Sequence, residues 1–400
     1  MTTTLTASMP RGRVILPGST VNGQPATLGV MGGGQLGRMF VQAAQRMGYF
    51  TAVLDPDAAS PAGLISHHHI QTDYLDEQGL AQFMQRCAAI TTEFENVPAP
   101  ALVTLGAHRP VAPGADAVAI AQNRVLEKEH FDRCGVACAP YAVIETAAQL
   151  AAVSDDLFPG ILKTARMGYD GKGQMRIKTR AELVAAWAEL KGVACVLEKM
   201  LPLKAECSVI VARGWDGVMV SFPVQLNLHR DGILAVTEVY EGNLPVSIAE
   251  RAQAAAKSIA NDLQYVGVMC VEFFVLQDDT LIVNEMAPRP HNSGHYTLDA
   301  CDQSQFDLQV RTLTGLPLVP PRPYCPAIML NLLGDTWLAF DDAPPWDKVL
   351  ALPGTHLHLY GKLKASKGRK MGHLNITGTT VAEVRATALK AAELLGLAPF

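Results

Sequence analysis

Two apolar runs separated by a short polar turn predict a β-hairpin in the second half of the chain. The runs are residues 266–276, VGVMCVEFFVL, and residues 281–283, LIV. Glu272 lies in the first run and Glu285 directly after the second, so strand pairing would bring the two carboxylates together. With Asn284 they would form a cluster of hard oxygen ligands that suits Mg²⁺ or Mn²⁺. An amphipathic hairpin with acids on its wet face is the alternative.

The N-terminal part predicts a parallel α/β sheet. A strand at residues 26–30 leads into the glycine turn GGGQLG, a helix at about 38–47, and a strand ending at Asp55. This spacing is compatible with dinucleotide binding and equally with a tight turn that binds nothing. After a helix at about 77–86, a strand ends near Glu93. Acids at the carboxyl edge of a parallel sheet indicate a ligand site, and a polar loop is the alternative.

The middle of the chain carries a cationic, glycine-rich loop. A strand ends at Lys163, and residues 165–174 then read ARMGYDGKGQ. Backbone N–H groups and positive charge arranged this way suit a polyphosphate, whereas a surface hairpin is the alternative. Upstream, a helix is expected across residues 119–131, with Arg124 and Lys128 one turn apart on what is usually a solvated face. Downstream, the segment after the strand at 194–199 would read an adenine edge through its backbone.

The C-terminal part is expected to contain a polar helix after His295, a proline-rich linker at 316–326 and a last small domain. Its loop at residues 360–373, YGKLKASKGRKMGH, holds five lysines or arginines. Such a loop suits a phosphate monoester, although a charge run is more often a solvated loop. The triplet at residues 67–69, HHH, is also predicted to be a solvated loop, since consecutive side chains cannot all face one ion.

Composition narrows the class of protein. The 400 residues are 49% hydrophobic and 18% charged, with a net charge of −5, so the chain is a folded protein with no global signal for nucleic acid. The 8 cysteines include no CxxC pair and predict reduced thiols in a cytoplasmic protein. Residues 1–25 look like a disordered lead without a signal peptide. No apolar run is long enough for a membrane-spanning helix.

Four stretches in this order, GGGQLGRM, GYDGKGQ, NEMAPRPHNSGH and GRKMGH, resemble the ATP-grasp superfamily. Within it they are similar to the 5-(carboxyamino)imidazole ribonucleotide synthetases of purine biosynthesis, over about residues 26–395. The resemblance implies an α/β and α+β fold with a parallel-sheet (preATP-grasp) domain at 26–115. It further implies an ATP-grasp domain at 116–315, with a lid at about 136–203, and a linker with a small C-terminal domain at 316–400.

The resemblance also implies ATP- and bicarbonate-dependent carboxylation of aminoimidazole ribonucleotide through carboxyphosphate, by a homodimer with no membrane or nucleic-acid partner. Glu272 and Glu285 would hold Mg²⁺ or Mn²⁺. Catalytic roles near bicarbonate would fall to Tyr169, Lys172, Arg289 and Asn292. The ribonucleotide would be bound by Gln35, Glu93, Arg289, Lys362, Arg369 and Lys370. The ATP contacts would be Arg124, Lys163, Gly168, Tyr169, Asp170, Gly171, Lys172, Gly173, Gln174, Glu198, Lys199, Met200, Leu201, Glu206, His229, Asn284 and Glu285.

One departure from the family pattern concerns the basic tail, which commonly reads ARPGRKMGH. Here Ser366 and Lys367 replace the arginine and proline. Lys367 would supply the charge of the missing arginine, and the loop is expected to be less rigid without the proline. Three rival functions stay open. They are another ATP-grasp ligase with a different acceptor, a dinucleotide-dependent dehydrogenase built on the glycine turn and Asp55, and a nucleotide-binding regulator without turnover.

Overall fold

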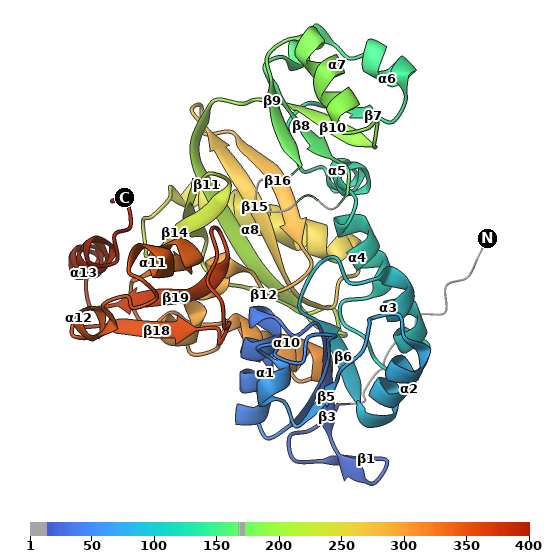
Figure 1. Ribbon diagram of the computed structural model, residues 1–400, viewed down its shortest axis with the longest axis vertical. Helices are drawn as coiled ribbons and strands as arrows, with labels where there is room; N and C mark the ends of the chain where they lie inside the picture. Colours follow the sequence, from blue (N-terminus) through green and yellow to red (C-terminus); the bar gives the residue numbers. More distant parts are fainter. Residues whose placement is uncertain (1–13, 167, 169–172) are drawn as a thin grey trace.

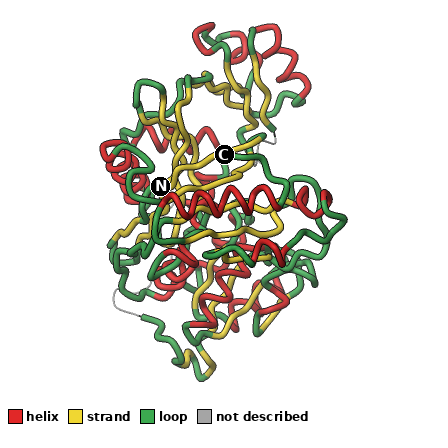
Figure 2. Tube along the Cα trace, turned by 90° about the vertical axis from the view of Figure 1, so that its left-hand side faces the viewer, coloured by secondary structure: helices red, strands yellow, loops and turns green. Residues whose placement is uncertain are grey.

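The computed structural model describes residues 14–166, 168 and 173–400. Figure 1 shows an N-terminal lobe, a lobe formed by residues 141–199 at the opposite end, and a C-terminal lobe at the side, arranged around a long central sheet. The same elongated arrangement is seen from the side in Figure 2.

The N-terminal sheet is parallel, with strand order β5-β4-β3-β6. Strands β3 and β6 at its centre and end are buried throughout, and β4 is buried after Phe50, whereas the edge strand β5 is partly exposed. The strands β3 and β6 are neighbours, so the glycine turn and Glu93 meet at one edge. The elements are β3 (Thr27–Met31), α1 (Gln35–Arg46), β4 (Phe50–Leu54), η1 (Gly63–Ile65), β5 (His68–Ile70), α2 (Glu77–Arg86), β6 (Ala89–Thr92) and α3 (Ala99–Gly106).

Residues 14–25 are folded, which corrects the predicted disordered lead; residues 1–13 lie outside the described part of the chain. Strands β1 (Thr20–Val21) and β2 (Gln24–Pro25) pair as a small hairpin. Ile15 is buried in the N-terminal core, its N–H donates to the Thr314 carbonyl, and its own carbonyl accepts from the Tyr49 hydroxyl. The apolar run at residues 14–16, VIL, was too short to distinguish this segment from a flexible lead by sequence alone.

A separate antiparallel sheet, with order β7-β10-β8-β9, forms the upper lobe. Strands β8 and β9 pair with Lys163 opposite Gln174, so the glycine-rich loop connects the two strands of a hairpin. The elements are β7 (Tyr141–Ile144), α6 (Ala147–Ala151), η2 (Asp155–Leu157), β8 (Gly160–Thr164), β9 (Gln174–Ile177), α7 (Arg180–Glu189) and β10 (Cys195–Lys199).

The central sheet combines strands from residues 203–287 with strands from residues 327–377, in the order β16-β15-β11-β13-β14-β17-β19-β18, with β12 on β11. The last strands therefore extend the main sheet through the β14–β17 pairing. Helices α8 and α10 pack on β11 and β15. The strands are β11 (Leu203–Arg213), β12 (Met219–Ser221), β13 (Gln225–Arg230), β14 (Ile233–Val239), β15 (Gly267–Leu276), β16 (Leu281–Ala287), β17 (Ala327–Leu333), β18 (Thr355–Leu359) and β19 (Lys370–Thr377). The helices are α8 (Val246–Asp262), η3 (Asn292–Gly294), α9 (Thr297–Ala300), α10 (Gln305–Thr314), α11 (Gly334–Ala339), α12 (Trp346–Leu350) and α13 (Val381–Leu394).

One helix prediction is corrected by the structure, and a second is confirmed. The helix expected across residues 119–131 is divided into α4 (Ala115–Ala121) and α5 (Arg124–Arg133), because Asn123 is extended and its side chain caps the Val125 N–H. Arg124 and Lys128 on α5 are buried, so their predicted solvated face is wrong. The polar helix expected after His295 is α10, which is buried along nearly its whole length between the N-terminal lobe and the central sheet.

Within the described ranges, no helix combines the length and apolar character that crossing a bilayer requires.

The basic loop of the C-terminal region is anchored on the start of α11. The Gly334 N–H donates to the Arg369 carbonyl at 2.8 Å, and the Gly368 N–H donates to Asp335 Oδ2 at 2.7 Å. A Cβ at Gly334 would lie 2.6 Å from the Ser366 nitrogen, which is closer than van der Waals contact allows. The close packing of the Gly334 backbone against the Ser366 backbone therefore determines where the loop lies.

We expect Gly334→Ala to lower the free energy of unfolding by about 1–3 kcal/mol, because the added methyl group overpacks against backbone. Gly106→Ala is the matched control. A Cβ there meets nothing nearer than 3.9 Å, and alanine in helix α3 should stabilise by about 0.5–1 kcal/mol. Urea unfolding of both variants measures the difference, and equal stabilities would contradict the anchoring role of Gly334.

Candidate active site

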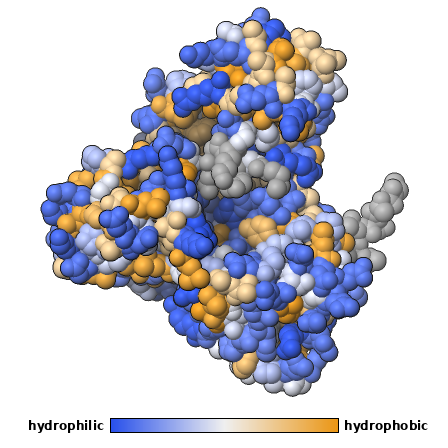
Figure 3. Space-filling view, viewed as in Figure 1, coloured by the Kyte–Doolittle hydropathy of each residue, from blue (hydrophilic) through white to orange (hydrophobic). Residues whose placement is uncertain are grey.

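A cavity of about 660 Å³ lies between the upper lobe and the central sheet. Figure 3 shows a hollow with largely hydrophilic walls at the junction of the lobes. Its lining includes nearly all predicted ATP contacts that the structure describes, although they come from segments far apart in the sequence. These are Arg124, Lys163, Gly168, Gln174, Glu198, Lys199, Met200, Leu201, Glu206, His229, Asn284 and Glu285. Gly173, in the turn directly before β9, does not line the cavity, and Tyr169, Asp170, Gly171 and Lys172 lie outside the described residues.

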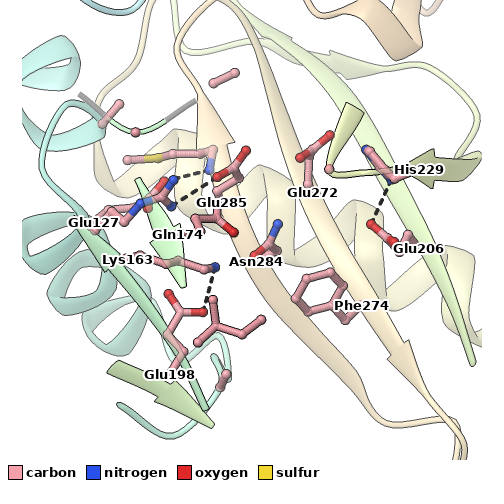
Figure 4. Close-up of a pocket in the computed structure, with 18 of the residues that line it drawn as sticks. Glu127, Lys163, Gln174, Glu198, Glu206, His229, Glu272, Phe274, Asn284 and Glu285 are labelled. Atoms are coloured by element: carbon pink, nitrogen blue, oxygen red, sulfur yellow. Dashed lines mark hydrogen bonds and ion pairs between the residues drawn. The ribbon is translucent and has the colours of Figure 1, made fainter. Parts of the chain in front are cut away.

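The predicted hairpin is confirmed: β15 and β16 are antiparallel neighbours, and Glu272 is the cross-strand partner of Glu285. Both carboxylates face the cavity (Figure 4). Burial, and after it the charge of Glu285, raises the pKa of Glu272 to about 7. Burial opposes ionisation of Glu285 as well, but Arg124 and Lys163 hold its pKa below the ordinary value. Glu285 is therefore held in its negatively charged form, whereas the negative charge of Glu272 would be stabilised by a bound cation.

The donor set fits a hard cation. Among the described residues, Glu272 Oε1 and Asn284 Oδ1 are buried and have no hydrogen-bond partner. Buried oxygen acceptors without partners are costly, and a divalent ion surrounded by oxygen ligands would remove that cost.

Ion pairs hold the cationic side chains of the cavity, and those made by Glu198 are buried. Arg124 Nη1 lies 3.1 Å from Glu285 Oε2, and Lys163 Nζ lies 2.9 Å from Glu198 Oε2. Lys128 approaches the other oxygen of Glu198 at 3.1 Å. Burial opposes the charge of Glu198, yet the two lysines lower its pKa. Two lysines around one glutamate leave a net positive charge beside the glycine-rich loop, which favours a phosphate.

Glu127 is a functional candidate that sequence reasoning missed. It accepts a hydrogen bond from the Met286 N–H at 2.7 Å, directly beside Glu285. Burial raises its pKa to about 8, even though Arg124 opposes this shift. Its position in the sequence could have indicated a role, because Glu127 lies one helical turn from Arg124 and next to Lys128. The helix was instead interpreted as solvated.

At the far end of the cavity, His229 Nδ1 lies 2.8 Å from Glu206 Oε2 (Figure 4). Burial alone would lower the pKa of His229. The close contact with Glu206 and the charge of Glu272 outweigh burial and raise it. The strand pair β11–β13 positions both side chains.

A second cavity of about 520 Å³ adjoins the first and contains every residue predicted for the ribonucleotide: Gln35, Glu93, Arg289, Lys362, Arg369 and Lys370. Lys367, the replacement noted in the tail, lines it too. The two cavities share five lining residues: Glu95, Arg289, His291, Asn292 and Lys370. Glu95 and His291 belong to stretches that the sequence marks as candidate ligand sites, but no specific role was predicted for either. Burial opposes the charge of Glu95, but its ion pair with Arg289 lowers its pKa to about 2.

The glycine turn is occupied by the protein's own acids. Gly34 and Gly37 donate their N–H groups to Glu93, and Gly33 donates to Asp55 Oδ2 at 2.7 Å. Asp55 also accepts from the Tyr74 hydroxyl at 2.7 Å. A dinucleotide pyrophosphate would have to displace these carboxylates, which argues against the dehydrogenase interpretation.

The histidine triplet is not the loop that was predicted, because His68 begins strand β5. The expected divergence of the side chains is confirmed: His67 stacks on Phe50, whereas His69 Nε2 lies 3.0 Å from the Asp55 carbonyl.

Family models match three consecutive parts of the chain. They describe a ribonucleotide synthetase preATP-grasp domain at residues 25–122, an ATP-grasp domain at 129–306 and a phosphoribosylaminoimidazole carboxylase C-terminal domain at 327–387.

Curated relatives and solved structures agree. The N5-carboxyaminoimidazole ribonucleotide synthase of Bacillus subtilis is 39% identical over 90% of this chain and 92% of its own. That of Brucella melitensis is 41% identical over 87% and 95%. The structure of an N5-carboxyaminoimidazole ribonucleotide synthetase with ADP is 37% identical, covers 96% of this chain and 99% of its own, and superposes with a TM-score of 0.87. The Aspergillus clavatus enzyme in complex with ADP and 5-aminoimidazole ribonucleotide is 32% identical over 93% and 99%, with a TM-score of 0.85. The resemblance carried by the four motifs is thus confirmed, and the chain belongs to the N5-carboxyaminoimidazole ribonucleotide synthase family of ATP-grasp ligases.

Proposed function

We propose that this chain carboxylates aminoimidazole ribonucleotide with ATP and bicarbonate, in an ADP-forming reaction that proceeds through carboxyphosphate. The observation that carries the proposal is the pair of adjoining cavities. One is lined by buried carboxylates and cations, the other is rich in lysine and arginine, and they share a wall. The family supplies the acceptor, since a relative at 32% identity binds ADP and 5-aminoimidazole ribonucleotide.

Glu272, Glu285 and Asn284 would hold Mg²⁺ or Mn²⁺. The ion would neutralise charge on the transferring phosphoryl group. Lys163 and Arg124, held in ion pairs before ATP binds, would contact the phosphates with little loss of side-chain freedom. The hinge at Lys199, Met200 and Leu201 would read the adenine edge, while Glu206 and His229 would lie near the ribose.

Bicarbonate would bind near the shared wall, where Arg289 and Asn292 line both cavities. Carboxyphosphate formed there would release CO₂ beside the amine of the ribonucleotide. Because carboxyphosphate hydrolyses in water, the site needs a cover, and the glycine-rich loop between β8 and β9 is the segment suited to that task. The roles proposed for Tyr169 and Lys172 rest on the family resemblance alone.

The ribonucleotide phosphate would be bound by Lys362, Arg369 and Lys370, and Gln35 and Glu93 would approach the rest of the nucleotide. A homodimer and a cytoplasmic location are part of the proposal, which the family and the eight free thiols support. Light scattering of the purified chain would measure the oligomeric state.

A second candidate is an ATP-grasp ligase with another acceptor, which would share the ATP cavity. The cationic lining of the second cavity favours an acceptor with a phosphate group over a neutral one. An ADP-release assay that omits bicarbonate and aminoimidazole ribonucleotide in turn separates the two. Undiminished turnover without the ribonucleotide would favour the second candidate.

Glu285→Gln should reduce ADP release by roughly 100-fold or more, because it removes a charge that organises both the metal and Arg124. Glu250→Gln is the control, since Glu250 is exposed on α8. Circular dichroism would establish that both variants fold. Turnover of a folded Glu285→Gln variant near the wild-type rate would remove the basis for the metal assignment.

The affinity for Mn²⁺ should increase with pH across about pH 6 to 8. The raised pKa of Glu272, about 7, means that its carboxyl group is mostly protonated at pH 6, and a metal must then displace a proton. The gain should approach tenfold per pH unit below the pKa and level off above it. Direct titration with Mn²⁺ without nucleotide measures this, with Glu272→Gln as the control. A flat pH profile in the wild type would count against metal binding at Glu272.

Lys367→Ala should raise the KM for aminoimidazole ribonucleotide about tenfold and leave kcat nearly unchanged, since a contact to the phosphate is lost in ground and transition states alike. Lys364→Ala is the matched control, because Lys364 belongs to the same loop but does not line the cavity. If both variants behave alike, Lys367 does not compensate for the altered tail.

A further inference from the structure

A second set of metal-ligating side chains lies directly behind the proposed Mg²⁺ site. Cys270 and Glu272 are two residues apart on β15, so their side chains point to the same face of the sheet. His291 approaches from the segment that follows β16. One ligand atom from each of the three residues lies within 4.8 Å of the other two.

The distances are close to those of a tetrahedral ion. His291 Nε2 and Glu272 Oε1 are 3.5 Å apart. Zinc bonds of about 2.0–2.3 Å place neighbouring tetrahedral ligands about 3.3–3.6 Å apart, so this pair already spans one edge. The Cys270 sulfur lies within 4.8 Å of both other ligand atoms, so an approach of at most about 1.3 Å would let it span the remaining edges.

The surroundings favour coordination at this point. Glu272 Oε1 has no hydrogen-bond partner among the described residues, so a cation would satisfy a buried acceptor. The Ser293 hydroxyl lies 2.9 Å from His291 Nδ1 and can accept a hydrogen bond from it in the tautomer that leaves a lone pair on Nε2. Such an outer hydrogen bond commonly orients a metal-binding histidine. The weaker contact of the Ser293 N–H with Nδ1, at 3.4 Å, would then be lost.

We propose that Cys270, Glu272 and His291 form an inhibitory site for a borderline or soft divalent cation such as Zn²⁺. A sulfur and an imidazole select Zn²⁺ over Mg²⁺, which prefers oxygen ligands. On binding, the cation replaces the thiol proton of Cys270, which passes to solvent, and no electron is transferred.

Inhibition follows from the shared ligand. Glu272 is part of the proposed Mg²⁺ site (Figure 4), and Zn²⁺ bound to its Oε1 would take a ligand atom that Mg²⁺ needs. Bound Zn²⁺ would therefore compete with Mg²⁺ for Glu272 and stop phosphoryl transfer. This last step rests on the proposed function, whereas zinc binding itself does not.

The binding test uses Co²⁺ as a spectroscopic probe on the whole chain. Wild type should develop a thiolate-to-cobalt absorption band in the near ultraviolet, which Zn²⁺ then abolishes. Cys270→Ala should lack the band and bind Zn²⁺ at least roughly 100-fold more weakly, since loss of a ligand should cost no less than loss of an outer-shell partner. Cys207→Ala is the matched control. Cys207 is equally buried on the adjacent strand β11 but packs in a different core cluster.

The second arm measures ADP release. Zn²⁺ should inhibit wild type and Cys207→Ala alike, added Mn²⁺ should relieve the inhibition, and Cys270→Ala should keep its basal rate and need roughly 100-fold more Zn²⁺. A wild-type cobalt spectrum without a thiolate band overturns the site. Equal zinc sensitivity of the two alanine variants overturns its role in inhibition. If the chain releases no ADP at all, the proposed function fails, and the cobalt spectrum still decides whether the site exists.

Discussion

Two carboxylates placed directly opposite each other on neighbouring strands are the constraint on which the rest of the active site depends. Like charges at a cross-strand pair repel, and burial removes the water that would screen them. The fold accommodates the pair by bringing the Arg124 guanidinium to Glu285 and by leaving Glu272 with a raised pKa. Arg124 reaches this position only because α5 starts a new helix at that residue, after the capping side chain of Asn123.

The cationic side chains of the site are likewise held in place by partners of opposite charge. The chain is acidic overall, with a net charge of −5, yet the cavity walls bring together lysines and arginines from α5, β8, β19 and the segment after β16. Each of Lys163, Arg124 and Arg289 is paired with a glutamate. Such pairs contribute little net stability when buried, but they hold charged groups in one position before a ligand arrives. On the proposed function, this arrangement allows a triphosphate to bind with little reorganisation of the protein.

The shared wall between the two cavities connects the chemistry of ATP with that of the acceptor. Arg289, His291 and Asn292 lie in one short segment after β16, so a single stretch of backbone serves both cavities. That segment is fixed from behind by α10: the Gln305 side chain accepts from the His291 N–H and donates to the His291 carbonyl. Burial of α10 between two lobes thus has a direct consequence for the site, since it immobilises the residues next to which a short-lived intermediate would form.

The sequence by itself determined the local elements and the chemistry of most site residues. The hairpin with Glu272 and Glu285, the glycine-rich loop after Lys163 and the basic tail were all evident from apolar runs, glycine spacing and charge, because these features depend on neighbours in the chain. Tertiary structure alone decided the rest. It buried Arg124 and Lys128, used Asp55 and Glu93 to occupy the glycine turn, and brought Glu95 and His291 to the shared wall. Each of these outcomes depends on partners that are remote in sequence, and periodicity carries no information about which distant charge a side chain will meet.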